Sequence, residues 1–203
     1  MEVEGIVLAA GLSTRTGDNY KMSLDIDGKS IIERCIEGMY DVCSKIIVVG
    51  GHRIEEIHSI LSRYNKVKVV YNENYRDGMF SSVKEGVRHI TKERFFFTPG
   101  DYPIINKNTY NAILKIDSDI VIPRFNERKG HPILIKSYLI EDLLNNCNYT
   151  SLRDFVRSKY AIIIDVNDSG VLKDVDTMED YDSVMKIVLD NKENMIKKLQ
   201  ITI

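Results

Sequence analysis

Gly5-Ile6-Val7-Leu8-Ala9-Ala10-Gly11 is the stretch that decides the fold of this 203-residue chain. A short, continuous apolar run that ends at a glycine is typical of a strand buried on both faces of a parallel sheet. Further strand patterns follow at residues 45–51, 67–71, 94–98, 119–123, 131–135 and 161–165. Between the first four strands, apolar residues recur at the spacing of one helix face, as at Ile32, Cys35, Ile36 and Met39.

The alternation of strands and helices from residue 4 to about 115 predicts right-handed βαβ crossovers. We therefore expect a doubly wound, mostly parallel, Rossmann-like α/β sheet. The later strands lie closer together in the sequence, so part of the sheet edge is expected to be antiparallel. Residues 1–190 are expected to form one domain, and residues 191–203 the end of a C-terminal helix or a frayed tail. Thr177, followed three residues later by Asp180, predicts the start of that last helix.

The composition argues against several classes of protein. The chain has 28 Lys plus Arg, 30 Asp plus Glu and a formal net charge of -2, so it lacks an overall positive field for nucleic acid or an anionic membrane. Its three cysteines, Cys35, Cys43 and Cys147, form no Cys-x-x-Cys pair, which argues against a zinc site or a disulfide framework. With no signal peptide and no apolar run of roughly 20 residues, a cytoplasmic protein is expected.

Ligands of open α/β sheets bind beyond the carboxyl ends of the strands, so the loops that follow strands are the candidate site. The first loop begins with the small residues Ala9, Ala10 and Gly11, whose backbone N–H groups can approach an anion closely. Arg15 and Lys21 add positive charge. The loop matches neither a Walker A motif nor a dinucleotide-binding fingerprint. Taken alone, it is either an anion-binding turn or an ordinary loop with surface charges.

A carboxylate follows the phenylalanine-rich strand, in Pro99-Gly100-Asp101-Tyr102-Pro103. Mg²⁺ binds one or two carboxylates together with phosphate oxygens, which makes Asp101 a candidate magnesium ligand. Asp176, in the acidic segment 174–180, is a candidate for a second ligand. The alternatives are local ones: Asp101 could cap a turn, and Asp176 could belong to the helix cap.

Two further loops carry polar residues. Asn72, Gly78, Ser81 and Ser82 follow the third strand, where a helix start could present serine amides and hydroxyls to a nucleotide; the alternative is a glycine turn with capping serines. The segment 124–131 contains three basic residues and a histidine that could bind an acceptor phosphate, or form a solvated loop and a hydrogen-bonded turn. These four residues are Arg124, Arg128, Lys129 and His131.

The pattern Leu8-Ala9-Ala10-Gly11-x-Ser13-x-Arg15-x-Gly17, with Lys21 and Leu24, resembles the signature of the MobA-like nucleotidyltransferases. Within that superfamily it is most similar to the molybdenum cofactor cytidylyltransferases. The segments 72–83, 100–103, 130–132 and 174–180 resemble further motifs of the same family. The resemblance implies a GT-A-like fold, Mg²⁺ as cofactor, and transfer of CMP from CTP to molybdopterin with release of pyrophosphate.

The resemblance also implies a role for each matching residue. The nucleotide would be bound by Leu8, Ala9, Ala10, Gly11, Asn72, Gly78, Ser81 and Ser82. Arg15 and Lys21 would hold the triphosphate, and Asp101 with Asp176 the metal. His131 and Arg128 would lie toward the acceptor. Ala10 favours CTP, because guanylyl relatives usually have glycine there.

The sequence departs from the family pattern in three places. Thr16 stands where methionine is usual, and three residues, not two, separate Gly17 from Lys21. The family element Gly-Asp-x-Gly-Ala-Arg is replaced by residues 148–155, in which only Arg153 matches. Transfer to a sugar or polyol phosphate, or a non-catalytic nucleotide- or cofactor-binding role, therefore stays open. A molybdoenzyme or chaperone is a possible partner for a finished cofactor.

Overall fold

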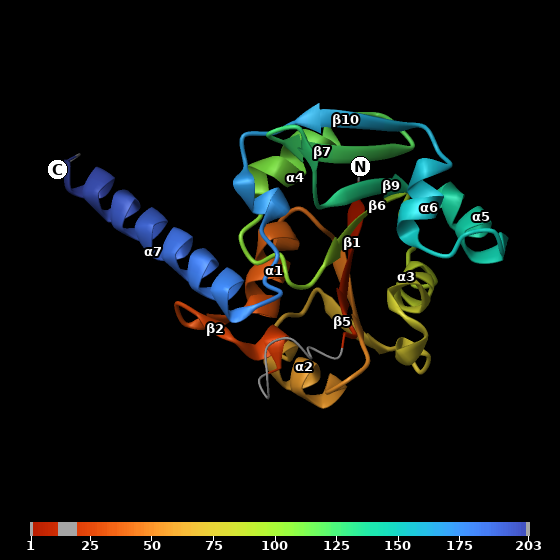
Figure 1. Cartoon of the computed structure of the whole chain (residues 1–203), viewed down its shortest axis with the longest axis horizontal. Helices are drawn as coiled ribbons and strands as arrows, with labels where there is room; N and C mark the ends of the chain where they lie inside the picture. Colours follow the sequence, from red (N-terminus) through yellow and green to blue (C-terminus); the bar gives the residue numbers. More distant parts are fainter. Residues whose placement is uncertain (1, 12–19, 202–203) are drawn as a thin grey trace.

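The computed structural model describes residues 2–11 and 20–201, without the side chains of residues 195 and 198–201. Its centre is an eight-stranded sheet in the order β10-β7-β9-β6-β1-β4-β5, with β8 paired to β7 (Figure 1). The strands are β1 (Val3–Ala9), β4 (Lys45–Gly50), β5 (Val67–Tyr71), β6 (Arg94–Pro99), β7 (Ile120–Phe125), β8 (Arg128–Lys129), β9 (Ile133–Lys136) and β10 (Ala161–Asp165). Strands β6, β1, β4 and β5 are all parallel, which confirms the predicted mostly parallel sheet.

Two strands of the sheet are antiparallel to their neighbours: the short β8, which pairs with β7, and β9, which lies inside the sheet and not at the edge where an antiparallel strand was expected. β9 pairs antiparallel with β6 on one side and with β7 on the other. Its inner residues Leu134 and Ile135 are buried, so an interior position removes their apolar surface from water. The edge beside β7 is formed by β10, which is parallel to it. The spacing of the strands in the sequence does not show whether β9 lies inside the sheet or at its edge.

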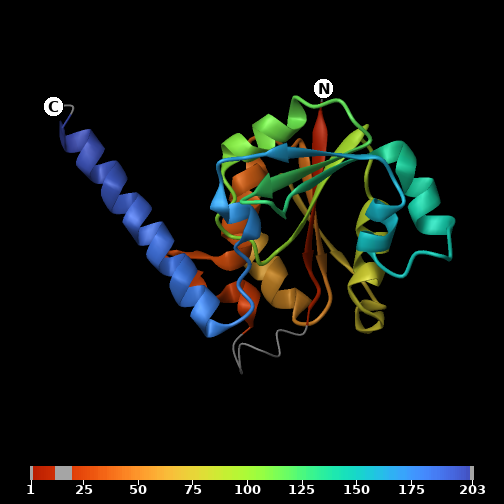
Figure 2. The same cartoon turned by 45° about the horizontal axis from the view of Figure 1, so that its top comes forward.

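Helices cover both faces of the sheet (Figures 1 and 2). On one face, α1 (Ile31–Tyr40), α2 (Ile54–Leu61) and α4 (Lys107–Leu114) contribute to a cluster that contains Val7. On the other, α3 (Met79–Val87), α5 (Ile140–Asn145) and α6 (Leu152–Arg157) contribute to a cluster that contains Ile6. Ile6 and Val7 are both fully buried, which is why the strand pattern is apolar at every position.

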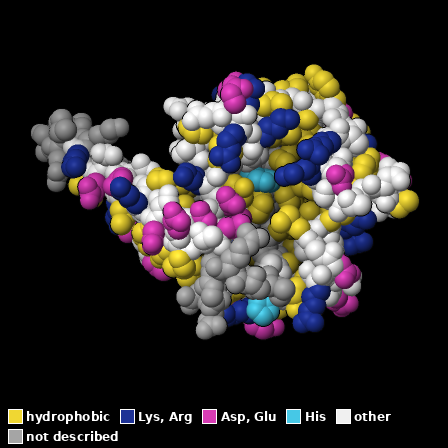
Figure 3. Space-filling model, in the orientation of Figure 1, with side chains coloured by type: hydrophobic (Ala, Val, Ile, Leu, Met, Phe, Trp, Pro, Cys, Tyr) yellow, Lys and Arg dark blue, Asp and Glu magenta, His cyan; other side chains and the backbone are white. Residues whose placement is uncertain are grey.

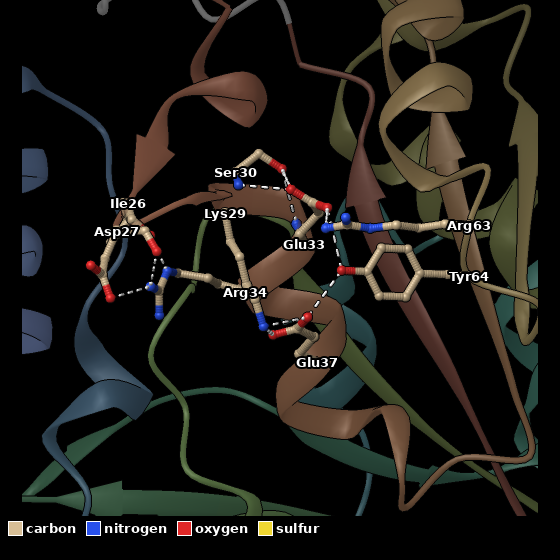
Figure 4. Close-up of polar contacts among 9 residues, drawn as sticks. All are labelled: Ile26, Asp27, Lys29, Ser30, Glu33, Arg34, Glu37, Arg63 and Tyr64. Atoms are coloured by element: carbon tan, nitrogen blue, oxygen red, sulfur yellow. Dashed lines mark hydrogen bonds and ion pairs between the residues drawn. The ribbon is translucent and has the colours of Figure 1, made fainter. Parts of the chain in front are cut away.

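The first turn of α1 is fixed by a capping box and an ion pair (Figure 4). Ser30 accepts a hydrogen bond from the Glu33 backbone, and the Ser30 N–H donates to Glu33 Oε2 at 2.8 Å. The other Glu33 oxygen pairs with Arg63 and accepts from the Tyr64 hydroxyl. This network joins α1 to the segment between α2 and β5. The start of α1 also lies close to the loop after β6, since a Cβ on Gly100 would lie 2.9 Å from Ile32 Cδ1.

The last helix, α7 (Met178–Ile201), extends away from the body of the protein (Figures 1 and 2). Its start is the predicted capping box: the Thr177 N–H donates to Asp180 Oδ2 at 2.8 Å, and the Asp180 N–H donates to Thr177 Oγ1 at 3.2 Å. The first half of α7 packs on the two-stranded hairpin β2 (Asp25–Ile26) and β3 (Lys29–Ser30), through a small apolar cluster that includes Val184.

Four short 3-10 helices complete the described chain: η2 (Lys21–Ser23), η3 (Tyr75–Asp77), η4 (Ser137–Leu139) and η5 (Ser169–Leu172). The two that matter most for the site are η2, which begins with Lys21, and η5, which precedes the acidic segment 174–176. Among the residues described, none of the helices is both long and apolar enough to cross a membrane.

Candidate functional site

Three of the predicted site residues meet beside the carboxyl ends of β1 and β6. Lys21 Nζ lies 2.7 Å from Asp101 Oδ2 and 2.9 Å from Asp176 Oδ1, although Asp101 is 80 and Asp176 is 155 residues away in the sequence. Two backbone hydrogen bonds hold the segments together: Gly100 N–H donates to the Leu8 carbonyl at 2.8 Å, and Val175 N–H donates to the Asp101 carbonyl at 3.0 Å. The fold therefore places a cation and two carboxylates at the edge where ligands of such sheets bind.

The charges of this cluster depend strongly on one another. Burial by itself would lower the pKa of Lys21, but the adjacent Asp101 and Asp176 carboxylates outweigh it and raise the pKa above its usual value. Lys21 is therefore a fixed cation at neutral pH. Asp174, which was not among the predicted ligands, is half-buried beside the same group, and burial together with Asp101 and Asp176 raises its pKa. The Asp-x-Asp spacing of residues 174–176 was the signal that could have found it.

The chemistry of the carboxylates fits a divalent cation. Asp101 Oδ1 is buried and has no hydrogen-bond partner in the described part of the chain, and an unpaired buried carboxylate oxygen is costly unless something binds it. Asp101 and Asp176 offer the hard oxygen donors that Mg²⁺ or Mn²⁺ prefers. Within residues 2–11 and 20–201, no group of three or more His, Cys, Asp or Glu side chains is arranged to hold a metal. The remaining ligands would have to come from phosphate oxygens and water.

The described part of the first loop is tightly built. Ala9 and Ala10 are buried, whereas Gly11 is exposed. A Cβ on Gly51, at the end of β4, would lie 3.1 Å from Ala10 Cβ and 2.6 Å from Tyr75, so little room separates these three loops. Arg15, predicted to hold the triphosphate, lies outside the described residues.

Tyr20, a residue to which the sequence assigned no role, closes this loop. Its buried hydroxyl donates to the Ala9 carbonyl at 2.9 Å, which ties the end of the loop back to β1. The Arg53 guanidinium lies 5.3 Å from the centre of the Tyr20 ring, within the range of a cation–π contact. Since Lys21 follows directly, Tyr20 fixes where the lysine side chain begins.

The predicted base- and ribose-binding residues form hydrogen bonds with one another. Asn72 is buried, its amide donates to Ser81 Oγ at 2.8 Å and to Ser82 Oγ at 2.9 Å, and its oxygen accepts from the Asn74 N–H. Gly78 has a φ of 97°, a backbone conformation that favours glycine. These side chains therefore shape the turn that starts α3, and the nucleotide contacts predicted for them stay a prediction.

His131, predicted to lie toward an acceptor, packs edge-on against Tyr102 with ring centres 5.0 Å apart. Its Nδ1 atom is buried and has no hydrogen-bond partner among the described residues. Burial lowers the pKa of His131 to about 4, so the imidazole is neutral at physiological pH. It can exchange a hydrogen bond with an acceptor, but it cannot attract a phosphate by charge.

The basic residues of the same loop differ in their availability. Arg124 is paired with Asp165 at 2.7 Å and with Glu127 at 3.2 Å, whereas Arg128 and Lys129 are exposed. In the view of Figure 3, hydrophobic side chains line a hollow that has Lys and Arg side chains along its upper side and acidic side chains to its left. Such a surface suits a substrate with an apolar or flat body and negatively charged groups.

Known proteins with similar sequences include nucleotidyltransferases that act on the molybdenum cofactor. Molybdenum cofactor cytidylyltransferase of Escherichia coli (strain K12) is 28% identical over 180 residues, which cover 88% of this chain and 93% of the relative. A probable molybdenum cofactor guanylyltransferase of Methanosarcina mazei is 26% identical over 134 residues, covering 63% of this chain and 60% of the relative.

Solved structures show the same fold. A nucleotidyl transferase from Methanothermobacter thermautotrophicus superposes with a TM-score of 0.81 at 20% identity, covering 94% of this chain and 99% of that one. Rv0371c of Mycobacterium tuberculosis, in a complex with manganese, superposes with a TM-score of 0.74 at 20% identity, covering 92% and 99%. The model of the MobA-like NTP transferase domain matches residues 5–163, most of the chain. The protein therefore belongs to the MobA-like NTP transferase family and is a nucleotidyltransferase.

Proposed function

We propose that this nucleotidyltransferase transfers CMP from CTP to molybdopterin, with release of pyrophosphate, during molybdenum cofactor biosynthesis. The observation that carries the proposal is the contact of Lys21 with both Asp101 and Asp176 at the strand ends. The likeness to the Escherichia coli molybdenum cofactor cytidylyltransferase, which extends over 88% of this chain, supports the choice of reaction.

The reaction needs positioning and charge more than covalent help from the protein. An oxygen of the acceptor phosphate attacks the α-phosphorus of CTP, a new P–O bond forms, and the bond to the bridging oxygen breaks so that pyrophosphate leaves. Lys21, Arg15 and the backbone N–H groups at residues 9–11 would hold the triphosphate in line for this attack. Asp101 and Asp176 would hold a divalent cation, proposed to be Mg²⁺, which when bound neutralises charge on the phosphate oxygens.

The proposed preference for CTP rests on the narrow space around Ala10. Ala10, Gly51 and Tyr75 approach one another closely, and an alanine at position 10 takes up room that a glycine would leave to a larger base. Because a guanylyltransferase also matches this chain, the preference needs a direct measurement. An Ala10→Gly variant should improve the use of GTP relative to CTP.

The proposed acceptor matches the surface around His131. The neutral imidazole lies next to the aromatic rings of Tyr102 and Phe97, a group of rings that suits a flat heterocycle such as a pterin. The exposed cations Arg128 and Lys129 are available to its phosphate. Residues 148–155, where the family element is replaced, comprise the turn before α6, with Ser151 as N-cap, and the first turn of that helix. This change keeps a sugar or polyol phosphate as the second candidate.

Measuring pyrophosphate release tests the proposal. The protein is incubated with Mg²⁺ or Mn²⁺ and each nucleoside triphosphate, with molybdopterin, with a sugar or polyol phosphate, or with no acceptor. Release that needs both CTP and molybdopterin is expected. Pyrophosphate release only with a sugar or polyol phosphate would show that this phosphate, and not molybdopterin, is the acceptor. No release with any pair would favour a non-catalytic binding protein. Asp101→Asn should abolish most of the release, whereas Asp41→Asn, which removes an exposed partner of Lys107, should leave it unchanged.

A further inference from the structure

Lys21 and the proposed divalent cation require the same oxygen atoms. The ammonium group lies 2.7 Å from Asp101 Oδ2 and 2.9 Å from Asp176 Oδ1, so it sits between the two carboxylates proposed as ligands. The Lys21 side chain is only 11% exposed and that of Asp101 only 15%. On the side of Asp101, water can therefore do little to screen a second positive charge placed beside the first, whereas the Asp176 side chain is 39% exposed.

The role proposed for Lys21 is to hold phosphate, and its two contacts with carboxylates compete with that role. An ammonium group that donates to two carboxylates has one donor left, so it can turn all of its donors to a triphosphate chain only by changing its rotamer and leaving the acids. A lysine is suited to such a change, because it is a flexible point charge with no fixed hydrogen-bonding plane. Lys21 therefore has two alternative sets of anionic partners: the two aspartates, or the phosphates of a nucleotide.

We propose that Lys21 acts as a built-in counter-ion that keeps divalent cations off Asp101 and Asp176 until a nucleoside triphosphate draws the lysine away. The inference rests on the proposed function, since it takes the nucleotide and metal roles from it. It adds a rule for binding: metal and nucleotide favour each other, and the metal alone binds weakly. By linkage, whatever factor the nucleotide adds to metal affinity, the metal adds to nucleotide affinity.

The test is the binding of Mn²⁺ alone, without nucleotide, followed by electron paramagnetic resonance of the free ion. Lys21→Met removes the ammonium charge and keeps an unbranched side chain, so Mn²⁺ affinity should rise about tenfold or more, within the usual range of such couplings. Lys21→Arg keeps the charge and should bind Mn²⁺ as weakly as the wild type. Lys107→Met is the matched control, because it removes an exposed lysine that also lies 2.7 Å from an aspartate. An unchanged Mn²⁺ affinity in a folded Lys21→Met variant would overturn the proposal.

A second measurement needs no substitution. If Mn²⁺ and the ammonium group compete, high Mn²⁺ concentrations should release Lys21 from the acids and speed its acetylation in the wild-type protein, as quantified by mass spectrometry, while Lys107 reacts at a constant rate. Equal labelling of Lys21 with and without Mn²⁺ would refute the competition. Neither measurement involves turnover. If the protein transfers nucleotides but shows neither the change in Mn²⁺ affinity nor the change in acetylation, only the counter-ion role of Lys21 is refuted. If both changes are seen but no nucleotide is transferred to any acceptor, only the proposed function is refuted.

Discussion

Replacing Tyr20 by phenylalanine tests whether the closure of the first loop positions Lys21. The change deletes one buried hydroxyl that donates to the Ala9 carbonyl at 2.9 Å and leaves the ring and its contact with Arg53 in place. A net hydrogen bond contributes about 0.5–1.5 kcal/mol, and a buried carbonyl left without its partner costs about 1–3 kcal/mol. The free energy of unfolding should therefore fall by about 1–3 kcal/mol, and the melting temperature by about 2–4 °C for each kcal/mol.

The kinetic effect of Tyr20→Phe should appear in nucleotide binding. If about 1 kcal/mol of that loss is felt by the bound triphosphate, the KM for CTP rises about fivefold, while kcat changes little because Tyr20 touches no reacting atom. Tyr40→Phe is the control, since the Tyr40 hydroxyl donates to Asn65 at 2.6 Å on the surface and its loss should change stability by no more than about 0.5 kcal/mol. Urea unfolding and steady-state kinetics give both quantities. Equal effects of the two substitutions on stability and on KM would refute the positioning argument.

Three further predictions address the metal site, the buried histidine and the start of α1. Asp101→Asn should lower kcat by about 10²–10³-fold with the fold intact by circular dichroism; near-normal turnover would contradict a metal role. Because burial lowers the pKa of His131 from 6.5 to about 4, the unfolded chain binds the extra proton between these values. The stabilisation by neutral His131 is therefore complete above pH 6.5 and is lost as the pH falls toward 4, with a slope of at most about 1.4 kcal/mol per pH unit. Unfolding of His131→Phe in urea at several pH values should lack this contribution, and an identical slope would disprove it. Ser30→Ala removes the N-cap of α1 and should cost about 0.5–2 kcal/mol in thermal unfolding, whereas Ser62→Ala, on an exposed turn, should cost less.

The strands and the start of α7 could be predicted from the sequence because their signals are local. Continuous apolar runs such as residues 5–10 fix a strand that is buried on both faces, and Thr177 with Asp180 fixes a helix start. The position of β9 between β6 and β7 could not be predicted. It depends on which strands β9 pairs with, and the apolar run of residues 133–135 is compatible with an edge position and with an interior one. The two-residue strands β2 and β3 are too short to give a periodic signal.

For the candidate site, too, some residues could be predicted from the sequence and others could not. Lys21, Asp101 and Asp176 were predictable because each follows a strand or precedes a helix in a recognisable motif, and the structure brings the three together. The internal bonding of Asn72 was not predictable, because a polar side chain after a strand can face a ligand or its own turn with the same sequence pattern. The role of Tyr20 was hidden for a related reason: its partner is a backbone carbonyl, which carries no sequence signal.

The projecting helix α7 has a practical consequence for handling the protein. A helix of 24 residues is about 36 Å long, and this one begins two residues after Asp176 and points away from the sheet (Figure 2). A fluorophore, affinity tag or surface anchor joined beyond Ile201 would therefore be held far from the candidate site at the strand ends. The protein could be immobilised by that end for single-molecule or biosensor work while the strand ends remain open to solution.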